Sequence, residues 1–326
     1  MRVLVTGATG FVGSNLAAAL VARGDEVRVL RRAHSRLDAL EGLDVTHMLG
    51  DILDEDSLRC ALEGCDQLFH VAGMAQYWRS TKETIYRVNV EGTRMVMDAA
   101  LKAGVTRVVH TSSIAALGIP SDDTIIDESH DFPESSRWWA YGHSKHLAEK
   151  EVGKAVQNGL SAVMVNPAVI MGPRDVNFVS GELIRASLRG LLRMVPPGGS
   201  NVVHVDDVVQ AHLAAAERGV LGERYILGGE NLSHWEMAAL LSDVCGGPPP
   251  RWKMPSAVLP PLRVLMDVWN RLRGGVPALT GEQVRLSGHR FFVDASKATR
   301  DLGLAALPVR QAAQDAFDWY KEHGLL

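Results

Sequence analysis

A tyrosine and a lysine lie four residues apart in the stretch Tyr141-Gly-His-Ser-Lys145, a spacing that suggests chemistry. On a helix this spacing places both side chains on one face. A free tyrosine has a pKa of about 10, and a nearby cation stabilises the phenolate and lowers that pKa. Such a tyrosine can give a proton to a carbonyl oxygen or remove one from an alcohol. Upstream, Thr111-Ser112-Ser113 ends an apolar run, and a hydroxyl there could face the same substrate.

A second chemical signal is the glycine spacing in VLVTGATGFVGSNLAAAL, residues 3–20. The apolar run and the three alanines before Leu20 also imitate a secretory signal with a small-residue cleavage site. However, Gly7, Gly10 and Gly13 fall three apart, which a signal does not need and a strand-to-helix turn does. Glycines let a pyrophosphate approach the main chain, and the positive end of the following helix faces it. We therefore interpret the stretch as a strand, a phosphate-binding turn and a helix over Phe11–Ala22.

These residues need a scaffold, and the alternation of strands and helices predicts one. Short apolar runs predict strands over Val3–Val5, Glu26–Leu30, Val45–Leu49, Asp66–His70, Arg107–His110 and Ser161–Val165. Helical periodicity predicts helices over Phe11–Ala22, Leu58–Leu62, Ile85–Ala103 and Ser144–Val156. Strands that alternate with helices indicate an α/β fold, a Rossmann-type doubly wound parallel sheet.

The end of the second predicted strand carries information on the coenzyme. An Asp or Glu about 20 residues past the glycines binds the ribose 2′-hydroxyl in many dinucleotide folds. Here the segment reads Leu30-Arg31-Arg32, without an acid. Two guanidinium groups suit a 2′-phosphate, and Arg36 is a candidate third contact. A solvated basic edge is the alternative, so we expect NADP, with NAD as the second choice.

Composition limits the classes of partner. The chain has 326 residues, 46% of them hydrophobic, and a formal net charge of −4, which gives no sign of a nucleic-acid or anionic-membrane partner. Its three cysteines stand at spacings that do not suggest a metal site, and they favour a reduced, cytoplasmic protein. The longest uncharged run, Asn158–Pro173, is interrupted by glycine and proline, so no membrane span is expected.

At this point the sequence resembles a known family, the extended short-chain dehydrogenase/reductases of the epimerase/dehydratase superfamily. The matching motifs are TGATGFVG at 6–13, GDILD at 50–54, HVAG at 70–73, NVEGT at 89–93, TSS at 111–113, YGHSK at 141–145, NPAVIMGP at 166–173, VHVDD at 203–207 and SKATRDLG at 296–303. Within the family it most resembles the dihydroflavonol-reductase-like branch and the hopanoid-associated sugar-epimerase-like proteins.

The resemblance implies roles for individual residues. Tyr141 is the implied acid/base, Lys145 binds the nicotinamide ribose and lowers the tyrosine pKa, and Ser113 hydrogen-bonds the substrate oxygen. Ser112 is the rival for the role of Ser113, and His143 is a bystander inside the motif. The implied cofactor-binding residues are Gly7, Gly10, Phe11, Val12, Gly13, Arg31, Arg32, Asp51, Ile52, Val71, Ala72, Gly73, Asn89, Tyr141, Lys145, Pro167, Ala168 and Val169.

The family topology also implies a domain division. A dinucleotide-binding domain covers 1–173, and 202–228 returns to it. A smaller, mostly helical substrate subdomain takes 174–201 and 229–326. Aromatic residues near its expected mouth could form an apolar substrate wall or pack the seam between the domains. The candidate substrate residues are Gln76, Tyr77, Trp78 and Trp139, with Trp138 beside them; Trp252 and Trp269 are expected in the core.

Three function classes compete: an NADPH-dependent ketone or aldehyde reductase, a nucleotide-sugar epimerase with bound NAD, and a non-catalytic dinucleotide sensor. Intact Ser113, Tyr141 and Lys145 argue against the sensor. Sugar epimerases of the family usually carry an arginine just before the strand at 203–205, and 199–204 has none. Arg185, Arg189 and Arg193 are spaced by four, which predicts that they share one helical face, and that face could line a phosphate site or be a solvated stripe. The resemblance further implies a homodimer built from the helices at 85–103 and 144–156.

Overall fold

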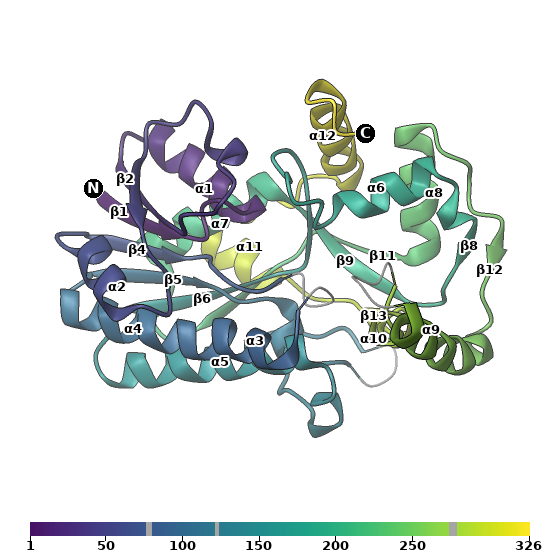
Figure 1. The fold of residues 1–326 in the computed structure, drawn as a ribbon, viewed down its shortest axis with the longest axis horizontal. Helices are drawn as coiled ribbons and strands as arrows, with labels where there is room; N and C mark the ends of the chain where they lie inside the picture. Colours follow the sequence, from purple (N-terminus) through teal and green to yellow (C-terminus); the bar gives the residue numbers. More distant parts are fainter. Residues whose placement is uncertain (76–79, 121–123, 274–278) are drawn as a thin grey trace.

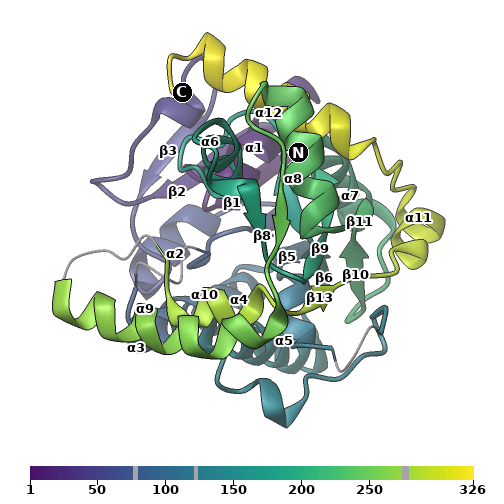
Figure 2. The ribbon, with the colours of Figure 1, turned by 90° about the vertical axis from the view of Figure 1, so that its right-hand side faces the viewer.

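The computed structural model describes residues 1–75, 80–120, 124–273 and 279–326. The chain forms two halves that lie side by side, a large sheet with helices on both faces and a smaller half of helices and short strands (Figure 1). Figure 2 views the smaller half from its outer side, with α12, α8 and α6 above and α9 and α10 below.

A seven-stranded sheet forms the first half, and every neighbouring pair in it is parallel. Its strands, in spatial order, are β10 (Arg224–Leu227), β6 (Ala162–Pro167), β5 (Arg107–Thr111), β4 (Gln67–His70), β1 (Arg2–Thr6), β2 (Glu26–Arg31) and β3 (Thr46–Leu49). The order reverses at β1, from which the chain continues outward on both sides. A doubly wound sheet binds its ligand at such a switch point, beyond the carboxyl ends of the strands.

Helices cover both faces of this sheet and bury its side chains. One face carries α1 (Phe11–Ala22), α7 (Val205–Arg218) and α11 (Ser296–Leu302). The other carries α2 (Glu55–Leu62), α3 (Lys82–Tyr86), α4 (Gly92–Ala103) and α5 (Ala140–Gln157). Both faces of β1 are therefore dry, with Val3 and Val5 packed on α1 and Leu4 on the opposite cluster. This burial explains why the strand is a continuous apolar run rather than an alternating one.

The second half is organised around a small mixed sheet. It holds β7 (Val169–Met171), β9 (Gly199–His204), β11 (Glu230–Ser233) and β13 (Arg290–Phe291), and a separate pair is formed by β8 (Met194–Val195) and β12 (Trp252–Lys253). Its helices are α6 (Gly181–Leu188), α8 (His234–Cys245), α9 (Leu259–Arg273), α10 (Gly281–Leu286) and α12 (Val309–Glu322). A third core forms where α6, α8 and α12 pack on β9.

The fold class predicted from the sequence is confirmed, and each predicted strand is present with small shifts at its ends. The helix predicted from Ser144 begins earlier, at Ala140, so Tyr141 lies in its first turn. α11, which the sequence placed in the substrate subdomain, packs its Ala298 and Leu302 into the core against α1 and α7. Within the described ranges, no helix has both the length and the apolar character needed to cross a bilayer.

Candidate active site

The turn between β1 and α1 is built so that only glycine fits at two of its positions. Gly7 has a φ of +73°, and a β-carbon there would lie 2.6 Å from the backbone nitrogen of Ala72. A β-carbon on Gly13 would lie 2.3 Å from the carbonyl oxygen of Gly7. The start of α1 therefore packs closely against the glycine loop at residues 7–10. That loop contacts the backbone of the segment that follows β4. Both positions therefore require glycine, as the phosphate-binding turn of a dinucleotide fold does.

The amino end of α1 is free to meet an anion. Gly10 is its N-cap and supplies no side chain to the first N–H groups, and the first turn holds no acidic residue. Unsatisfied N–H groups and the helix dipole together attract a phosphate group. Phe11 is buried and Val12 is half-buried, so this end of the helix is fixed in place by packing. The glycine turn between β1 and α1, which we call the glycine cradle, and the uncapped start of α1 together suit the pyrophosphate of a dinucleotide.

The candidate coenzyme residues of the next strands follow at the same edge of the sheet. Leu30 pairs with Thr6, so Arg31 and Arg32 lie beside the glycine turn. Arg31 is half-buried and its Nε donates to Nδ1 of His47 over 3.2 Å, whereas Arg32 is exposed. Arg36, the suggested third contact, forms an ion pair with Asp38 instead.

Asp51 and Ile52 come after β3, and each is held by a local contact. A carboxylate oxygen of Asp51 accepts a hydrogen bond of 3.0 Å from the backbone N–H of Leu53. The Ile52 side chain lies under α4, where a β-carbon on Gly92 would come within 2.7 Å of it. Val71, Ala72 and Gly73 follow β4, directly across from the glycine turn.

The three candidate catalytic side chains come from two elements that meet at this edge. Ser113 follows β5, while Tyr141 and Lys145 lie one turn apart on α5. The Tyr141 and Ser113 side chains are joined by a hydrogen bond. Lys145 is buried, and its Nζ donates to the carbonyl oxygen of Thr111 over 3.0 Å. A β-carbon on Gly73 would lie 3.2 Å from the same Nζ, so the lysine faces the loop that leaves β4.

Burial shifts the pKa values of Lys145 and Tyr141. It lowers the pKa of Lys145 to about 8, although the charge of Glu149 works in the opposite direction. Burial also raises the pKa of Tyr141, and the hydrogen bond with Ser113 only partly offsets this rise. Desolvation outweighs any lowering of the tyrosine pKa by Lys145 in this structure, where the ammonium group donates to the Thr111 carbonyl oxygen. Tyr141 therefore holds its proton at neutral pH, as a proton donor must.

Asn89 links two elements of the site through its side chain. It lies in a π-helical turn, Arg87–Glu91, which interrupts the continuous helix from α3 to α4. Its side chain accepts a hydrogen bond of 2.7 Å from the N–H of Met74 and donates one of 2.9 Å to Ser144. Such single π-turns are frequent at functional sites, and here the turn ties the loop after β4 to α5.

Glu149 is a buried acid of the site that the sequence analysis missed. One carboxylate oxygen accepts hydrogen bonds of 2.5 Å from Ser112 Oγ and from Asn166 Nδ2. Burial raises the pKa of this carboxyl group. Tyr141, Lys145 and Glu149 are spaced by four along α5, so this spacing was the available signal. Because its hydroxyl is bonded to Glu149, Ser112 is a weaker rival for the role of Ser113.

Residues 167–169 lie at the junction of the two halves. Pro167 ends β6, the N–H of Ala168 donates to Leu227 on β10 over 3.0 Å, and Val169 begins β7. The segment thus passes from the large sheet to the small one beyond the carboxyl end of β6.

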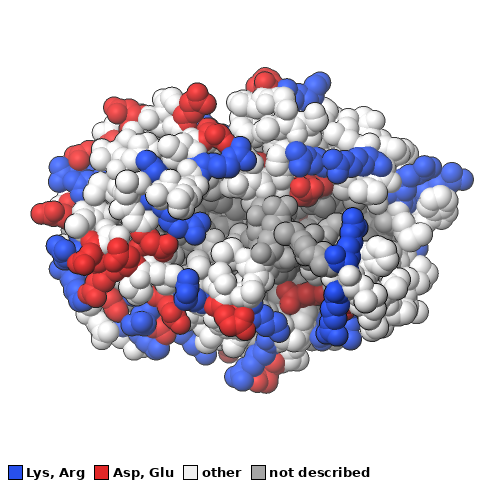
Figure 3. Space-filling model, viewed as in Figure 1, with Lys and Arg blue, Asp and Glu red and all other residues white. Residues whose placement is uncertain are grey.

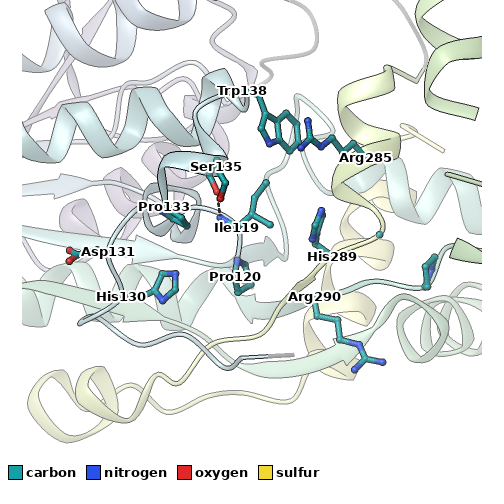
Figure 4. A pocket seen from close by; sticks show the side chains of 13 residues that line it. Ile119, Pro120, His130, Asp131, Pro133, Ser135, Trp138, Arg285, His289 and Arg290 are labelled. Atoms are coloured by element: carbon teal, nitrogen blue, oxygen red, sulfur yellow. Dashed lines mark hydrogen bonds between the residues drawn. The ribbon is translucent and has the colours of Figure 1, made fainter. Parts of the chain in front are cut away.

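The two tryptophans that precede Tyr141 differ in their surroundings. Trp139 is buried and packs 6.1 Å from the Tyr141 ring, between centroids, and 5.6 Å from Phe291. Trp138 lines a cavity of about 690 Å³ and stacks on the Arg285 guanidinium, 3.7 Å from the ring centroid (Figure 4). The other suggested substrate residues, Gln76, Tyr77 and Trp78, lie outside the described residues.

Two sequence expectations about the second half are wrong. Trp252 and Trp269 are not core residues, because they are 50% and 53% exposed. The three arginines do not share one helical face, because α6 ends at Leu188 and Gly190 takes a left-handed φ of 69°. The first of them, Arg185, stacks over Phe178 at 3.3 Å and donates to the Leu325 carbonyl.

The parallel sheet, the glycine cradle and the tyrosine and lysine of α5 define a dinucleotide-binding oxidoreductase-type fold. Residues 3–228 match the NAD dependent epimerase/dehydratase family, and the chain belongs to that family. It is accordingly an NAD(P)-dependent enzyme of the extended short-chain dehydrogenase/reductase type.

Relatives cover the whole chain. A Synechocystis sp. protein named dihydroflavonol 4-reductase is 39% identical over 98% of this chain and 94% of its own length. The sterol demethylase protein B of Methylococcus capsulatus is 36% identical over all of both chains. Among solved structures, that of gox2253 has a TM-score of 0.89 with 39% identity and covers 100% of this chain and 99% of its own.

Proposed function

We propose that this protein is an NADPH-dependent reductase of a ketone or aldehyde, in which Tyr141 gives the proton. The observation that carries the proposal is the pair of Tyr141 and Ser113, hydrogen-bonded to each other beyond the carboxyl end of β5, with the tyrosine pKa raised by burial. A phenol that keeps its proton is suited to donate it when negative charge develops on a carbonyl oxygen.

The residues of the site have distinct tasks in this reaction. When bound, the coenzyme supplies a hydride to the carbonyl carbon. Ser113 Oγ donates a hydrogen bond that holds the carbonyl oxygen near the Tyr141 hydroxyl. The phenol proton passes to that oxygen as the carbon–oxygen double bond becomes a single bond, so the product is an alcohol and Tyr141 is left as phenolate. Lys145, charged below a pH of about 8, holds the ribose edge of the coenzyme and stabilises the phenolate that forms.

Several residues would hold the coenzyme. The glycine turn and the uncapped start of α1 suit the pyrophosphate. Arg31 and Arg32 lie beside that turn, and no acid stands at the end of β2, which supports a 2′-phosphate and hence NADPH. In the space-filling view, Lys and Arg side chains lie on both halves beside their junction, with Asp and Glu side chains among them (Figure 3).

An uncharged carbonyl compound is the proposed substrate class. Several relatives bear the names of carbonyl reductases, among them a 4-hydroxy-2-methyl-3-oxo-4-farnesyl-3,4-dihydroquinoline-1-oxide ketoreductase of Stigmatella aurantiaca at 33% identity over 97% of this chain and 95% of its own length. A nucleotide diphosphate needs cationic partners because buried charge is costly without them. Arg185 is already engaged by Phe178 and a backbone carbonyl, and the segment before Val203 has no arginine. Both observations favour the reductase over a nucleotide-sugar epimerase.

The test is a pair of assays on one preparation. NADPH oxidation is followed by absorbance over a panel of apolar aldehydes and aryl ketones, and interconversion of UDP-glucose and UDP-galactose is followed by a coupled assay. We expect NADPH consumption with members of the panel and no sugar interconversion. Epimerisation without net NADPH consumption would overturn the proposal.

A further inference from the structure

Helix α9 presents an apolar face to solvent. Its outward stripe, at spacings of one, three and four residues, consists of side chains that are between 48% and 80% exposed: Val264, Leu265, Val268, Trp269 and Leu272. Of the fifteen residues of α9, all of them described, only Leu259 is buried. A surface helix of a globular protein normally turns such a stripe inward, and a contiguous exposed apolar patch marks an interaction site.

The polar side of the same helix faces the protein. Asp267 accepts a hydrogen bond of 3.2 Å from the N–H of Gly281 at the start of α10. Asn270 donates one of 2.9 Å to the carbonyl oxygen of Leu279. These bonds fix the rotation of α9, so its apolar face cannot turn inward without losing them. The fold therefore holds α9 in this orientation through specific hydrogen bonds.

The charge around this face is opposite to that of the chain. Residues 251–273 carry five Lys or Arg residues and a single acid, Asp267, although the chain as a whole has a net charge of −4. Arg271 and Arg273 are exposed in the last turn of α9. Arg251 and Lys253 are exposed on either side of Trp252, on the segment that leads into the helix. Figure 1 places α9 at the lower edge of the second half.

We propose that α9 is a membrane-interface helix, which docks this protein on an anionic phospholipid surface with its axis in the plane of the bilayer. An apolar stripe with leucine, valine and tryptophan, flanked by arginines, is the arrangement by which amphipathic helices insert into the headgroup boundary. The arginines then meet anionic headgroups, while Trp269 lies at the depth that indole rings favour. The chain binds the surface and does not span it.

Charge decides between a lipid surface and a second copy of the chain. Two copies that paired through this stripe would bring together two segments that each carry five cations and one acid, Asp267, which already accepts a hydrogen bond from Gly281. An anionic bilayer offers negative charge over the whole footprint. The proposal is independent of the reaction assigned to the protein.

The test is flotation of the full chain with vesicles, made either of phosphatidylcholine alone or of equal parts phosphatidylcholine and phosphatidylglycerol. We expect the wild type to float with the anionic vesicles and to bind the neutral ones far more weakly. Leu265→Ser with Leu272→Ser should lower the affinity for anionic vesicles about ten-fold or more, because both side chains lose their apolar immersion. Val220→Ser with Leu221→Ser, at two exposed apolar residues before β10, is the matched control and should bind as the wild type does.

A second variant separates charge from hydrophobicity. Arg271→Gln with Arg273→Gln should weaken binding to anionic vesicles and leave the weak binding to neutral vesicles unchanged. The proposal is overturned if the wild type does not float with anionic vesicles, or if the leucine variant binds as well as the control. It is also overturned if sedimentation shows a wild-type self-association that the leucine variant abolishes and vesicles do not compete with, since the face then belongs to a second copy.

Discussion

Gly13→Ala tests whether the turn between β1 and α1 is the coenzyme cradle. The added β-carbon would lie 2.3 Å from the Gly7 carbonyl oxygen, 2.7 Å from the Gly7 carbonyl carbon and 2.8 Å from Ala8 Cα. All three are backbone atoms, so no side chain can rotate away. Because an ordinary contact is near 3.5 Å, the Gly7 peptide must move by roughly 1 Å or the helix must tilt.

Two opposing effects determine the size of the change in stability. Overpacking a close contact costs about 1–3 kcal/mol, whereas alanine in place of glycine within a helix contributes about 1 kcal/mol. We therefore expect a net loss of folding free energy between roughly 0 and 2 kcal/mol, and the variant stays folded. The affinity for the coenzyme should fall more than the stability does, because the displaced Gly7 peptide is the surface that the pyrophosphate must approach. A shift of about 1 Å in such a site can cost on the order of a hundred-fold.

The assay is titration calorimetry with NADPH beside urea unfolding, and α5 offers a matched control. Gly153 is also a helical glycine, but a β-carbon there meets nothing within 4 Å. Gly153→Ala should raise the unfolding free energy by about 0.5–1 kcal/mol and leave the NADPH affinity unchanged. Wild-type NADPH affinity in a folded Gly13→Ala variant would refute the assignment of the cradle.

Three further predictions concern coenzyme choice, pH and assembly. Replacing Arg31 and Arg32 with Ala should weaken NADPH binding about a hundred-fold or more by calorimetry and spare NADH, since each of the two lost charged hydrogen bonds is worth roughly 1.5–3 kcal/mol; equal losses for both coenzymes would contradict a 2′-phosphate contact. Glu149→Gln removes the charge that supports the Lys145 ammonium group, so the pKa of Lys145 should fall below about 8 and the alkaline limb of the kcat/KM profile should move to lower pH. Glu151→Gln on the same helix should leave that limb in place, and an unmoved or raised limb in the Glu149 variant would contradict the coupling. Sedimentation velocity should show a homodimer formed through α4 and α5, and a monomer at all concentrations would count against it.

The sequence predicted the sheet well because its strands are buried on both faces. Runs such as Val3–Val5 are apolar throughout, and glycines mark the turn that follows. The candidate catalytic pair was also readable, since four-residue spacing on a helix is a geometric statement. Glu149 continues that spacing, but a charged residue is usually exposed, and only the fold shows that Ser112 and Asn166 hold it in the interior.

Other features depend on tertiary packing and could not be read from the sequence. The direction of the Tyr141 pKa shift depends on burial, which outweighs a cation that donates its hydrogen bond elsewhere. The end of α6 depends on the left-handed backbone at Gly190, which breaks the regular spacing of the arginines. The exposure of Trp269 reverses the rule that large aromatic residues lie inside, because the polar face of α9 is the one bound to the protein.

The central claim is that Tyr141 gives the proton in carbonyl reduction, and Tyr141→Phe tests it most directly. The variant keeps the ring that packs beside Trp139 and loses only the hydroxyl. Measured with the best carbonyl substrate, kcat should fall by roughly 10²–10⁴-fold, while the NADPH dissociation constant stays near that of the wild type. A variant that retains more than about a tenth of the wild-type kcat would contradict the account.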